Sequence, residues 1–214
     1  TQLVEEPLLE KEIIKTIPVI KKVSNSVSVE VRQQYEENPY PRWIKPSLPP
    51  ISRTITQLAN DINLKLSSAD KINVKNPKVL IAGCGTGQQS INSARAYTNC
   101  QVTAVDLSLS SLAYAKRKTD EFAIDNISYM QGDILDLEEL GEFFDVIESV
   151  GVLHHMDDPM KGWKILVNLL EPAGLMKIGL YSDIARRHLP EAQKELKKTS
   201  TEVSSDEIKK YRNY

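Results

Sequence analysis

Short apolar runs alternate with helical patterns in the 214-residue chain from position 77 onwards. Each run has the length of a buried strand. The runs span residues 78–82, 101–105, 127–130, 143–147 and 175–180. In the segments between them, apolar positions recur at helical spacing near 88–97, 109–122 and 159–171. This alternation predicts right-handed βαβ units and a doubly wound, mostly parallel α/β sheet with helices on both faces.

The helix expected over 159–171 has sequence signals at both ends. Asp157 or Asp158 can accept hydrogen bonds from its first backbone N–H groups, and Pro159 suits the first helical position. Residues 171–174, with the sequence Glu-Pro-Ala-Gly, are typical of a turn. The sequence therefore predicts a helix, a turn and then the last strand.

The first 70 residues have a different pattern. Five prolines between positions 39 and 50 exclude a long helix there, because proline lacks an N–H and forces the preceding residue into extended geometry. Apolar positions at helical spacing then predict an amphipathic helix over 51–66. We therefore expect three parts: an N-terminal helical lid or strap over 1–70, a core over 77–181 and a C-terminal helical extension over 182–214.

The strongest chemical signal is the loop after the first predicted strand, which carries Gly83, Gly85 and Gly87. Glycines let backbone N–H groups approach a ligand closely, and the N-terminus of the following helix favours negative charge. Asp106 ends the next predicted strand, where a carboxylate can accept hydrogen bonds from both hydroxyls of a ribose. Both features lie at the carboxyl edge of the predicted sheet, so the sequence predicts a nucleoside site there.

The G-x-G-x-G pattern resembles motif I of the class I S-adenosylmethionine-dependent methyltransferases, of the bacterial type. The resemblance covers residues 77–181 and continues through Asp106, which is similar to the ribose-binding acidic residue of that family. Residues 131–134 are similar to the adenine-binding segment, and residues 144–159 to the fourth strand with the loop behind it. Residues 170–175 are similar to the turn into the fifth strand.

This resemblance implies a Rossmann-like methyltransferase fold, S-adenosylmethionine as cofactor and S-adenosylhomocysteine as product. It also implies a set of cofactor-binding residues at the carboxyl edge of the sheet. These are Gly83, Cys84, Gly85, Gly87, Gln88, Asp106, Leu107, Ser108, Gly132, Asp133, Ile134, Ser149 and Val150.

Other interpretations of the loop stay open. A dinucleotide fingerprint starting at Gly83 needs its third glycine at position 88, which is Gln88, so an NAD-binding oxidoreductase domain is disfavoured. The glycines can also serve only to make tight turns. A further alternative is a scaffold or sensor that binds the nucleoside without catalysis.

Ile81 departs from the family pattern. It stands two positions before the first motif glycine, where the family commonly has an acidic residue that organises the methionine end of the ligand. The departure concerns the anchoring of the ligand's amino group and leaves nucleoside binding unaffected. Backbone carbonyls or a polar side chain such as Gln88 can substitute for the missing carboxylate.

Two histidines follow the fourth predicted strand, at the place where a methyl acceptor should enter. His154 or His155 can act as a general base, because imidazole titrates near neutral pH. The alternative is that they brace the loop by hydrogen bonds. Cys84 is interpreted as a small loop filler and not as a nucleophile, and we expect no metal site because the sequence has no ligand cluster.

The segment over 35–43 is aromatic, prolyl and charged. Its Asn38-Pro39-Tyr40 is interpreted as a chance match to the N-P-P-Y motif of amino-methyltransferases, because no hydrophobic strand precedes it. The longer stretch resembles a segment found before the methyltransferase core in bacterial proteins that often carry tetratricopeptide repeats. It can be a lid that touches donor or acceptor, or a strap that packs a tryptophan on the core. The lid candidates are Tyr35, Tyr40, Arg42 and Trp43.

Composition and charge mainly exclude classes of protein and of partner. A net charge of −2 and a pI near 6.0 indicate no general attraction to nucleic acid or anionic lipid. No signal peptide or transmembrane run is expected, and two cysteines are too few for a disulfide framework. We therefore expect a cytoplasmic protein.

The number of expected strands has a further implication. We expect five, whereas class I methyltransferase sheets usually have seven, so the hypothesis is a fragment that lacks the final hairpin. An exposed sheet edge would then invite pairing with a second copy as a homodimer. The sequence gives no indication of the methyl acceptor, because acceptor specificity does not follow from fold.

Overall fold

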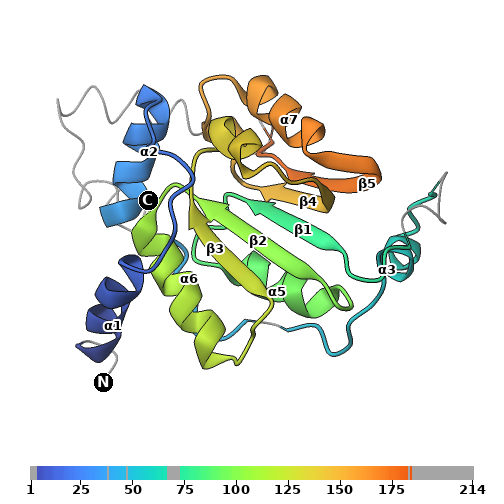
Figure 1. Ribbon diagram of the computed structural model, residues 1–214, viewed down its shortest axis with the longest axis horizontal. Helices are drawn as coiled ribbons and strands as arrows, with labels where there is room; N and C mark the ends of the chain where they lie inside the picture. The colour runs from blue at the N-terminus through green and yellow to red at the C-terminus, as the bar shows by residue number, and fades with distance from the viewer. Residues whose placement is uncertain (1–3, 38, 47, 67–72, 183, 185–214) are drawn as a thin grey trace. The chain divides into compact units, whose positions relative to one another are not determined.

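The computed structural model describes residues 4–37, 39–46, 48–66, 73–182 and 184, and its centre is a parallel sheet (Figure 1). Its strands lie side by side in the order β3-β2-β1-β4-β5, and every neighbouring pair is parallel. The strands are β1 (Lys78–Ala82), β2 (Gln101–Asp106), β3 (Ile127–Gln131), β4 (Phe144–Val150) and β5 (Leu170–Gly179). The predicted α/β architecture is confirmed.

Helices cover both faces of this sheet. Val79 and Ile81 of β1 point to the face that carries α5 (Gln88–Ala96) and α6 (Leu109–Glu121). Leu80 and Ala82 point to the opposite face. That face carries η1 (Ile134–Leu140), η2 (Leu153–His155) and α7 (Pro159–Asn168). Because β1 is buried on both faces, its residues form a continuous apolar run in the sequence.

The start of α7 follows the prediction, whereas the segment after it differs. The Asp158 carboxylate accepts hydrogen bonds from the backbone N–H groups of Met160 and Lys161, both at 3.0 Å. The predicted separate turn over 171–174 is wrong, because β5 already pairs with β4 at Leu170. A register shift follows, with Ala173 in the left-handed region at φ 71°, so the turn residues form an irregularity inside a longer strand.

The helix predicted over 51–66 is shorter than expected. Helix α3 spans Ile55–Asp61 and begins with a capping box between Thr54 and Gln57. The preceding residue, Arg53, is held in an extended bridge: its N–H donates to the Ala96 carbonyl and its carbonyl accepts from Thr98. This tertiary pairing excludes the first predicted turn of the helix, and residues 67–72 lie outside the described part.

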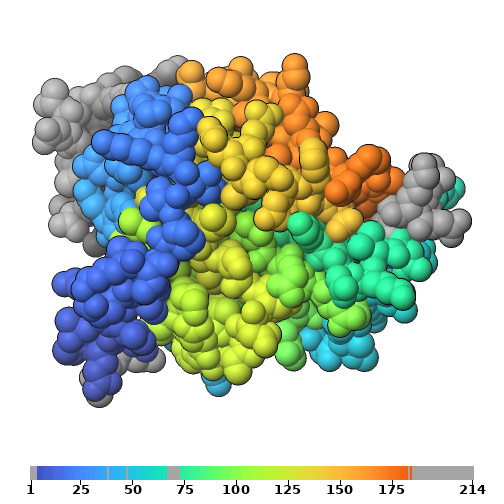
Figure 2. All heavy atoms as spheres, in the orientation of Figure 1, coloured from blue at the N-terminus to red at the C-terminus, as the bar shows by residue number. Residues whose placement is uncertain are grey.

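The N-terminal residues belong to the same compact unit as the sheet. The chain divides after Gly179, and of the second part only residues 180–182 and 184 are described. Helices α1 (Glu5–Ile14) and α2 (Ser26–Glu37) both contact α6. Figure 2 shows the blue N-terminal residues lying against the yellow-green residues of the α6 region.

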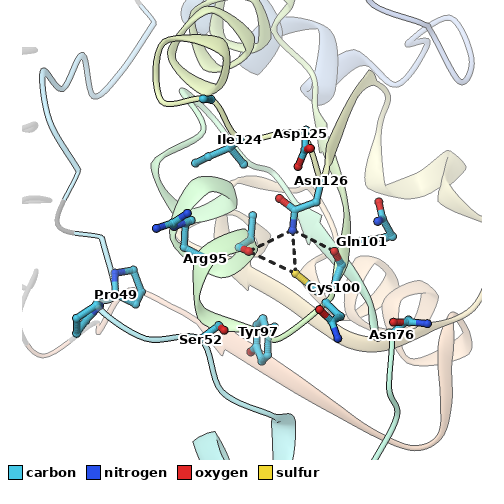
Figure 3. A pocket seen from close by; sticks show the side chains of 14 residues that line it. Pro49, Ser52, Asn76, Arg95, Tyr97, Cys100, Gln101, Ile124, Asp125 and Asn126 are labelled. Atoms are coloured by element: carbon cyan, nitrogen blue, oxygen red, sulfur yellow. Dashed lines mark hydrogen bonds between the residues drawn. The ribbon is translucent and has the colours of Figure 1, made fainter.

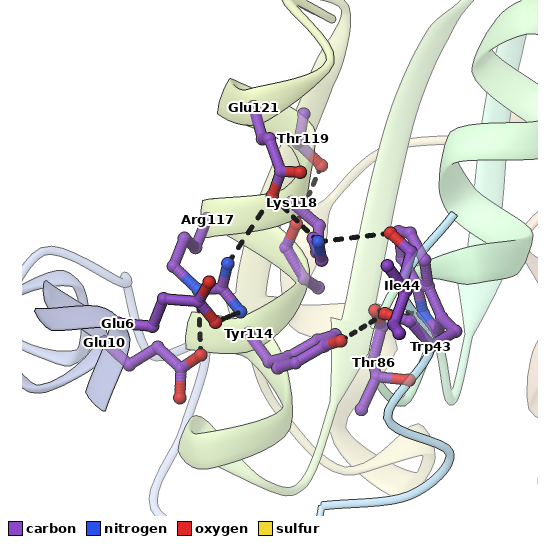
Figure 4. A network of polar contacts seen from close by, with 11 residues as sticks. Glu6, Glu10, Trp43, Ile44, Thr86, Tyr114, Arg117, Lys118, Thr119 and Glu121 are labelled. Carbon is purple, nitrogen blue, oxygen red and sulfur yellow. Dashed lines mark hydrogen bonds and ion pairs between the residues drawn. The ribbon is translucent and has the colours of Figure 1, made fainter. Parts of the chain in front are cut away.

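A buried arginine fixes α1 to α6 (Figure 4). The Arg117 side chain is 7% exposed, and its Nε lies 2.9 Å from Glu10 Oε1. Its Nη2 lies 3.0 Å from Glu6 Oε2. The guanidinium also lies 5.0 Å from the ring centroid of Tyr114. The buried guanidinium therefore joins α1 to α6 through two ion pairs.

The N-terminal segment also extends the sheet beside β3. The N–H of Gln131 donates to the Pro18 carbonyl at 2.8 Å, and the N–H of Ile20 donates to the Gln131 carbonyl at 2.8 Å. The carboxyl end of β3 is therefore paired within the chain. Among the described helices, none is long and apolar enough to cross a membrane.

Candidate functional site

The glycine loop joins β1 to α5 and needs glycine for both conformation and space. Gly83 and Gly87 have φ angles of +80° and +82°. A Cβ on Gly83 would lie 2.4 Å from Val152 Cγ2, and one on Gly87 would lie 2.5 Å from Ala115 Cβ. Gly85 differs, because the nearest atom to its missing Cβ is the Tyr40 carbonyl oxygen at 3.6 Å. The loop is therefore packed at its two ends and more open in the middle.

Asp106 ends β2 directly beside this loop. Its Oδ2 accepts a hydrogen bond from the Gly85 N–H at 2.7 Å, and its Oδ1 accepts from the Ser108 N–H at 3.0 Å. Burial raises the pKa of the Asp106 carboxyl above its ordinary value, although hydrogen bonds from the N–H groups around it oppose that shift. The negative charge of Glu36 raises this pKa further.

Glu36 of α2 is a residue that the sequence did not reveal. Its carboxylate accepts hydrogen bonds from the Leu109 N–H at 2.8 Å and the Ser110 N–H at 2.9 Å. These are the first backbone donors of α6, so the carboxylate caps this helix from a distant part of the chain. Nothing local in the sequence marks Glu36, because its partners lie more than 70 positions away.

The segment around Trp43 crosses the glycine loop. The Thr86 hydroxyl donates to the Pro41 carbonyl at 2.5 Å, and the Trp43 Nε1–H donates to the Thr86 carbonyl at 3.1 Å. The indole packs edge-on against Tyr114 (Figure 4). It also stacks on Phe122 and is 8% exposed. The strap interpretation therefore describes the placement of Trp43 in this structure.

The other three lid candidates lie elsewhere on the N-terminal segment. Tyr40 is 73% exposed, and Tyr35 is half-buried on α2. The Arg42 guanidinium lies 5.5 Å from the Tyr114 ring centroid and 3.8 Å from a Glu10 oxygen. Of the four candidates, Tyr40 is the one whose own backbone touches the loop at Gly85.

The candidate residues after β3 form a second wall of the site. The N–H of Gly132 donates to the Asp106 carbonyl at 3.0 Å, which ties this segment to the end of β2. Asp133 is buried and caps η1, because its Oδ1 accepts from the Leu135 N–H at 3.0 Å. Ile134 is also buried. The Leu107 carbonyl accepts a hydrogen bond from the side-chain amide of Gln131, the last residue of β3, at 2.9 Å.

The residues at the end of β4 complete the carboxyl edge. Ser149 is fully buried, and no described residue forms a hydrogen bond with its hydroxyl. Val150 is 41% exposed. His154 and His155 lie in η2, with ring centroids 4.3 Å apart.

Gln88 and Cys84 are the remaining candidates. Gln88 begins α5 and is half-buried, directly after Gly87. Cys84 is buried inside the loop, and burial raises the pKa of its thiol well above the ordinary value. A thiol that resists ionisation is a poor nucleophile, which agrees with its interpretation as a loop filler.

The chain also has a hollow of about 650 Å³ at the opposite edge of the sheet (Figure 3). It is lined by the end of α5 and by residues at or just before the amino ends of strands, among them Asn76, Gln101 and Asn126. The side-chain amide of Asn126 is already used, since it donates to the carbonyls of Ala94 and Cys100. Ligands of open α/β sheets bind at the carboxyl ends of the strands, so we assign the candidate site to the glycine loop.

A family model described as a methyltransferase domain matches residues 73–213. The chain belongs to this methyltransferase family. Its parallel sheet and glycine loop are those of the class I S-adenosylmethionine-dependent enzymes, and S-adenosylmethionine is the family's cofactor. The site fits this ligand: Gly85 is half-buried and not tightly packed, Asp106 offers carboxylate oxygens, and the buried Ser149 hydroxyl has no hydrogen-bond partner among the described residues.

Three curated relatives are bacterial proteins that match part of this chain. The protein syc1184_c of Synechococcus is 36% identical over 118 residues, which are 55% of this chain and 28% of that protein. The protein RP028 of Rickettsia prowazekii is 31% identical over 144 residues, 66% of this chain and 54% of that protein. The ubiquinone biosynthesis O-methyltransferase of Coxiella burnetii is 33% identical over 117 residues, with shares of 55% and 48%. The chain thus spans about half or less of these relatives.

One solved structure with a TM-score above 0.5 shares the fold of this chain. The [4+2]-cyclase SpnF is 21% identical with a TM-score of 0.51, and the match covers 76% of this chain and 60% of that one. PKMT2 from Rickettsia typhi in complex with AdoHcy is 33% identical with a TM-score of 0.44, covering 48% and 20% of the two chains. The likeness to SpnF concerns the fold alone, which a cyclase and methyltransferases share.

Proposed function

We propose that this methyltransferase domain transfers a methyl group from S-adenosylmethionine to an oxygen, nitrogen or carbon nucleophile. The observation that carries the proposal is the Asp106 carboxylate, held by the Gly85 N–H at 2.7 Å at the carboxyl edge of the sheet. A carboxylate in that position can accept both ribose hydroxyls of an adenosine ligand. The glycine loop, Asp133 and Ile134 then enclose the rest of the nucleoside.

The cofactor supplies an activated methyl group on a sulfonium. When this methyl group moves to the acceptor atom, the electrons of the broken S–C bond stay on sulfur. The protein has to align the acceptor and exclude water, and it needs a base only where the acceptor carries a proton. His154 and His155 are the base candidates, because η2 places them just after β4. Tyr40 and Arg42 are the exposed members of the N-terminal segment that can meet an acceptor.

A hydroxyl acceptor is the first class to test. The Coxiella relative is described as an O-methyltransferase of ubiquinone biosynthesis and shares 33% identity with this chain. A cytoplasmic location is part of the same proposal, and the two cysteines, both free and buried, agree with a reducing compartment. The fusion to tetratricopeptide repeats and the homodimer stay predictions.

Calorimetric titration and a methyl-transfer assay test the proposal. We expect S-adenosylhomocysteine to bind with micromolar affinity and NAD not to bind. We then expect radioactive methyl from S-adenosylmethionine to appear in an acceptor from a panel of phenols, amines and acidic carbon compounds. Binding without turnover on any acceptor would favour the scaffold or sensor, and NAD binding alone would contradict the proposal.

Asp106 also predicts a pH dependence of ligand binding. We expect the affinity for S-adenosylhomocysteine to fall as pH is lowered through the raised pKa of this carboxyl. The reason is that ribose hydroxyls donate to the ionised form, whereas protonation removes its charge and one acceptor. Dissociation constants measured between about pH 4 and 8 check this, a range that begins near the ordinary value for aspartate.

Two neighbours of Asp106 define the controls for that titration. The Cys84 thiol stays neutral over this range because burial raises its pKa, so it adds no step. Glu36→Gln removes the negative charge that raises the pKa of Asp106, so it should move the loss of affinity to lower pH. An identical pH profile in wild type and Asp106→Asn would show that another group titrates.

A further inference from the structure

A buried carboxylate lies behind the glycine loop and has no role in the site described so far. Glu148 stands near the end of β4, and its side chain is 3% exposed. Its Oε1 accepts hydrogen bonds from the Tyr97 hydroxyl at 3.0 Å and the Ser93 hydroxyl at 3.2 Å. Its Oε2 accepts from Gln89 Nε2 at 2.7 Å, and all three donors come from α5 and the residue after it.

The charge of Glu148 is hydrogen-bonded but only weakly paired with positive charge. Within the described residues its one ionic partner is Lys177, whose Nζ lies 3.5 Å from Oε2 and whose side chain is 65% exposed. Burying a carboxylate is costly unless it is hydrogen-bonded and paired with a positive charge. A cationic ligand group nearby would supply the missing compensation.

The register of the sheet places Glu148 beside the position that lacks its acidic residue. Ile81 of β1 is the direct neighbour of Glu148 of β4. Register partners on adjacent parallel strands point to the same face of the sheet, and Ile81 packs on the face that carries α5. The carboxylate missing from β1 is therefore present one strand away, at the same level and on the same face.

Gln89 connects this carboxylate to the ligand side. It is the second residue of α5, next to the glycine loop, and it is half-buried. An ionised carboxylate only accepts hydrogen bonds, so the Gln89 nitrogen must face Glu148 and its carbonyl oxygen must face away. No described residue donates to that oxygen, which leaves it as an acceptor beside the loop.

We propose that Glu148 is a positioning residue for the amino group of the methyl donor, acting through Gln89 in place of an acid at Ile81. The α-ammonium at the methionine end of the ligand donates to Gln89 Oε1, and Gln89 Nε2 donates to Glu148. The buried negative charge gains a second positive neighbour through this relay. The proposal rests on the proposed function, because it assumes that the donor binds at the glycine loop.

Two ligands that share the nucleoside separate this role from a structural one. S-adenosylhomocysteine carries the α-ammonium, whereas 5′-methylthioadenosine lacks the whole amino-acid end. We expect wild type to bind S-adenosylhomocysteine more tightly, and Glu148→Gln to weaken that binding roughly tenfold or more, as for a lost hydrogen bond to a charged group. Binding of 5′-methylthioadenosine should change less than about twofold, since the relay does not reach the nucleoside.

Three variants make the comparison specific. Gln89→Ala should reproduce the selective loss, and E148Q/Q89E, which exchanges the two groups, should restore much of it. Tyr97→Phe is the matched control, because it removes a hydrogen bond to the same carboxylate but leaves the bond to Gln89. It should leave the preference between the two ligands unchanged, with folding checked by thermal unfolding of every variant.

The other possible outcomes contradict either the relay or the proposed function. Equal weakening of both ligands by Glu148→Gln, or none, overturns the relay and leaves Glu148 as a support of the fold. Equal affinity of wild type for the two ligands also overturns the relay, while the donor site stands. If wild type binds neither ligand, the proposed function itself fails and the relay fails with it.

Discussion

Asp106→Ala is expected to weaken the binding of S-adenosylhomocysteine about 100-fold, or about 2.8 kcal/mol at 1.4 kcal/mol per tenfold. The substitution removes the acceptor for the ribose hydroxyls and also the bond that holds the Gly85 N–H at 2.7 Å. Hydrogen bonds from neutral donors to a charged acceptor are worth more than ordinary ones, and here two or more are lost together. Calorimetric titration measures the change directly.

Two control variants distinguish a specific loss of ligand binding from a general effect on the fold. Asp106→Asn keeps the shape and one acceptor oxygen, so its loss should be smaller than that of Asp106→Ala. Asp125→Ala removes an exposed carboxylate at the amino end of β3, far from the glycine loop in the sheet, and should leave the affinity unchanged. An Asp106→Ala protein that is folded and binds with wild-type affinity would move the ribose site elsewhere.

Gly83→Ala is expected to lower the free energy of unfolding by about 2–5 kcal/mol. The left-handed conformation at φ +80° costs a residue with a Cβ about 1–2 kcal/mol. Overpacking adds about 1–3 kcal/mol, because the new methyl would lie 2.4 Å from Val152 Cγ2. Urea denaturation measures the sum, which is a large part of the 5–15 kcal/mol that is typical of a domain.

A substitution at a second glycine separates the cost of backbone strain from the cost of steric overlap. Gly151 has a φ of +77°, but no atom lies within 4 Å of the position of its missing Cβ. Gly151→Ala should therefore cost only the strain, about 1–2 kcal/mol. Combining Gly83→Ala with Val152→Ala should recover part of the overlap cost. If Gly83→Ala costs no more than Gly151→Ala, the contact with Val152 does not constrain the loop.

Periodicity predicted the sheet well because its strands are buried on both faces. The apolar runs 78–82 and 101–105 lie within or coincide with β1 and β2, and α5 and α6 follow the predicted limits 88–97 and 109–122 closely. The third predicted helix, over 159–171, is shorter, because α7 ends at Asn168 and β5 begins at Leu170. The prediction was wrong where tertiary pairing competes with local pattern. The bridge between Arg53 and Tyr97 shortens α3, and the pairing of Leu170 with Phe144 turns a predicted turn into part of β5.

The residues of the candidate site are likewise of two kinds: some are indicated by the sequence, and others are revealed only by the tertiary structure. Gly83 and Asp106 carry local signals, since a glycine loop between strand and helix and an acid at a strand end follow from the topology. Glu36 has no such signal, because its partners belong to α6. Glu148 lies just beyond the predicted strand 143–147 and carries no local signal, and only its register with Ile81 relates its charge to the site.

The sequence by itself determined the parallel α/β core, the glycine loop and the aspartate at the end of β2, because each depends on a period or spacing within a short stretch of chain. The tertiary structure alone decided the placement of Trp43 in the core, the capping of α6 by Glu36 and the pairing of Glu148 with Gln89. These contacts join segments separated by tens of residues. Their free energy comes from burial and from satisfying buried polar groups, which a local pattern does not encode.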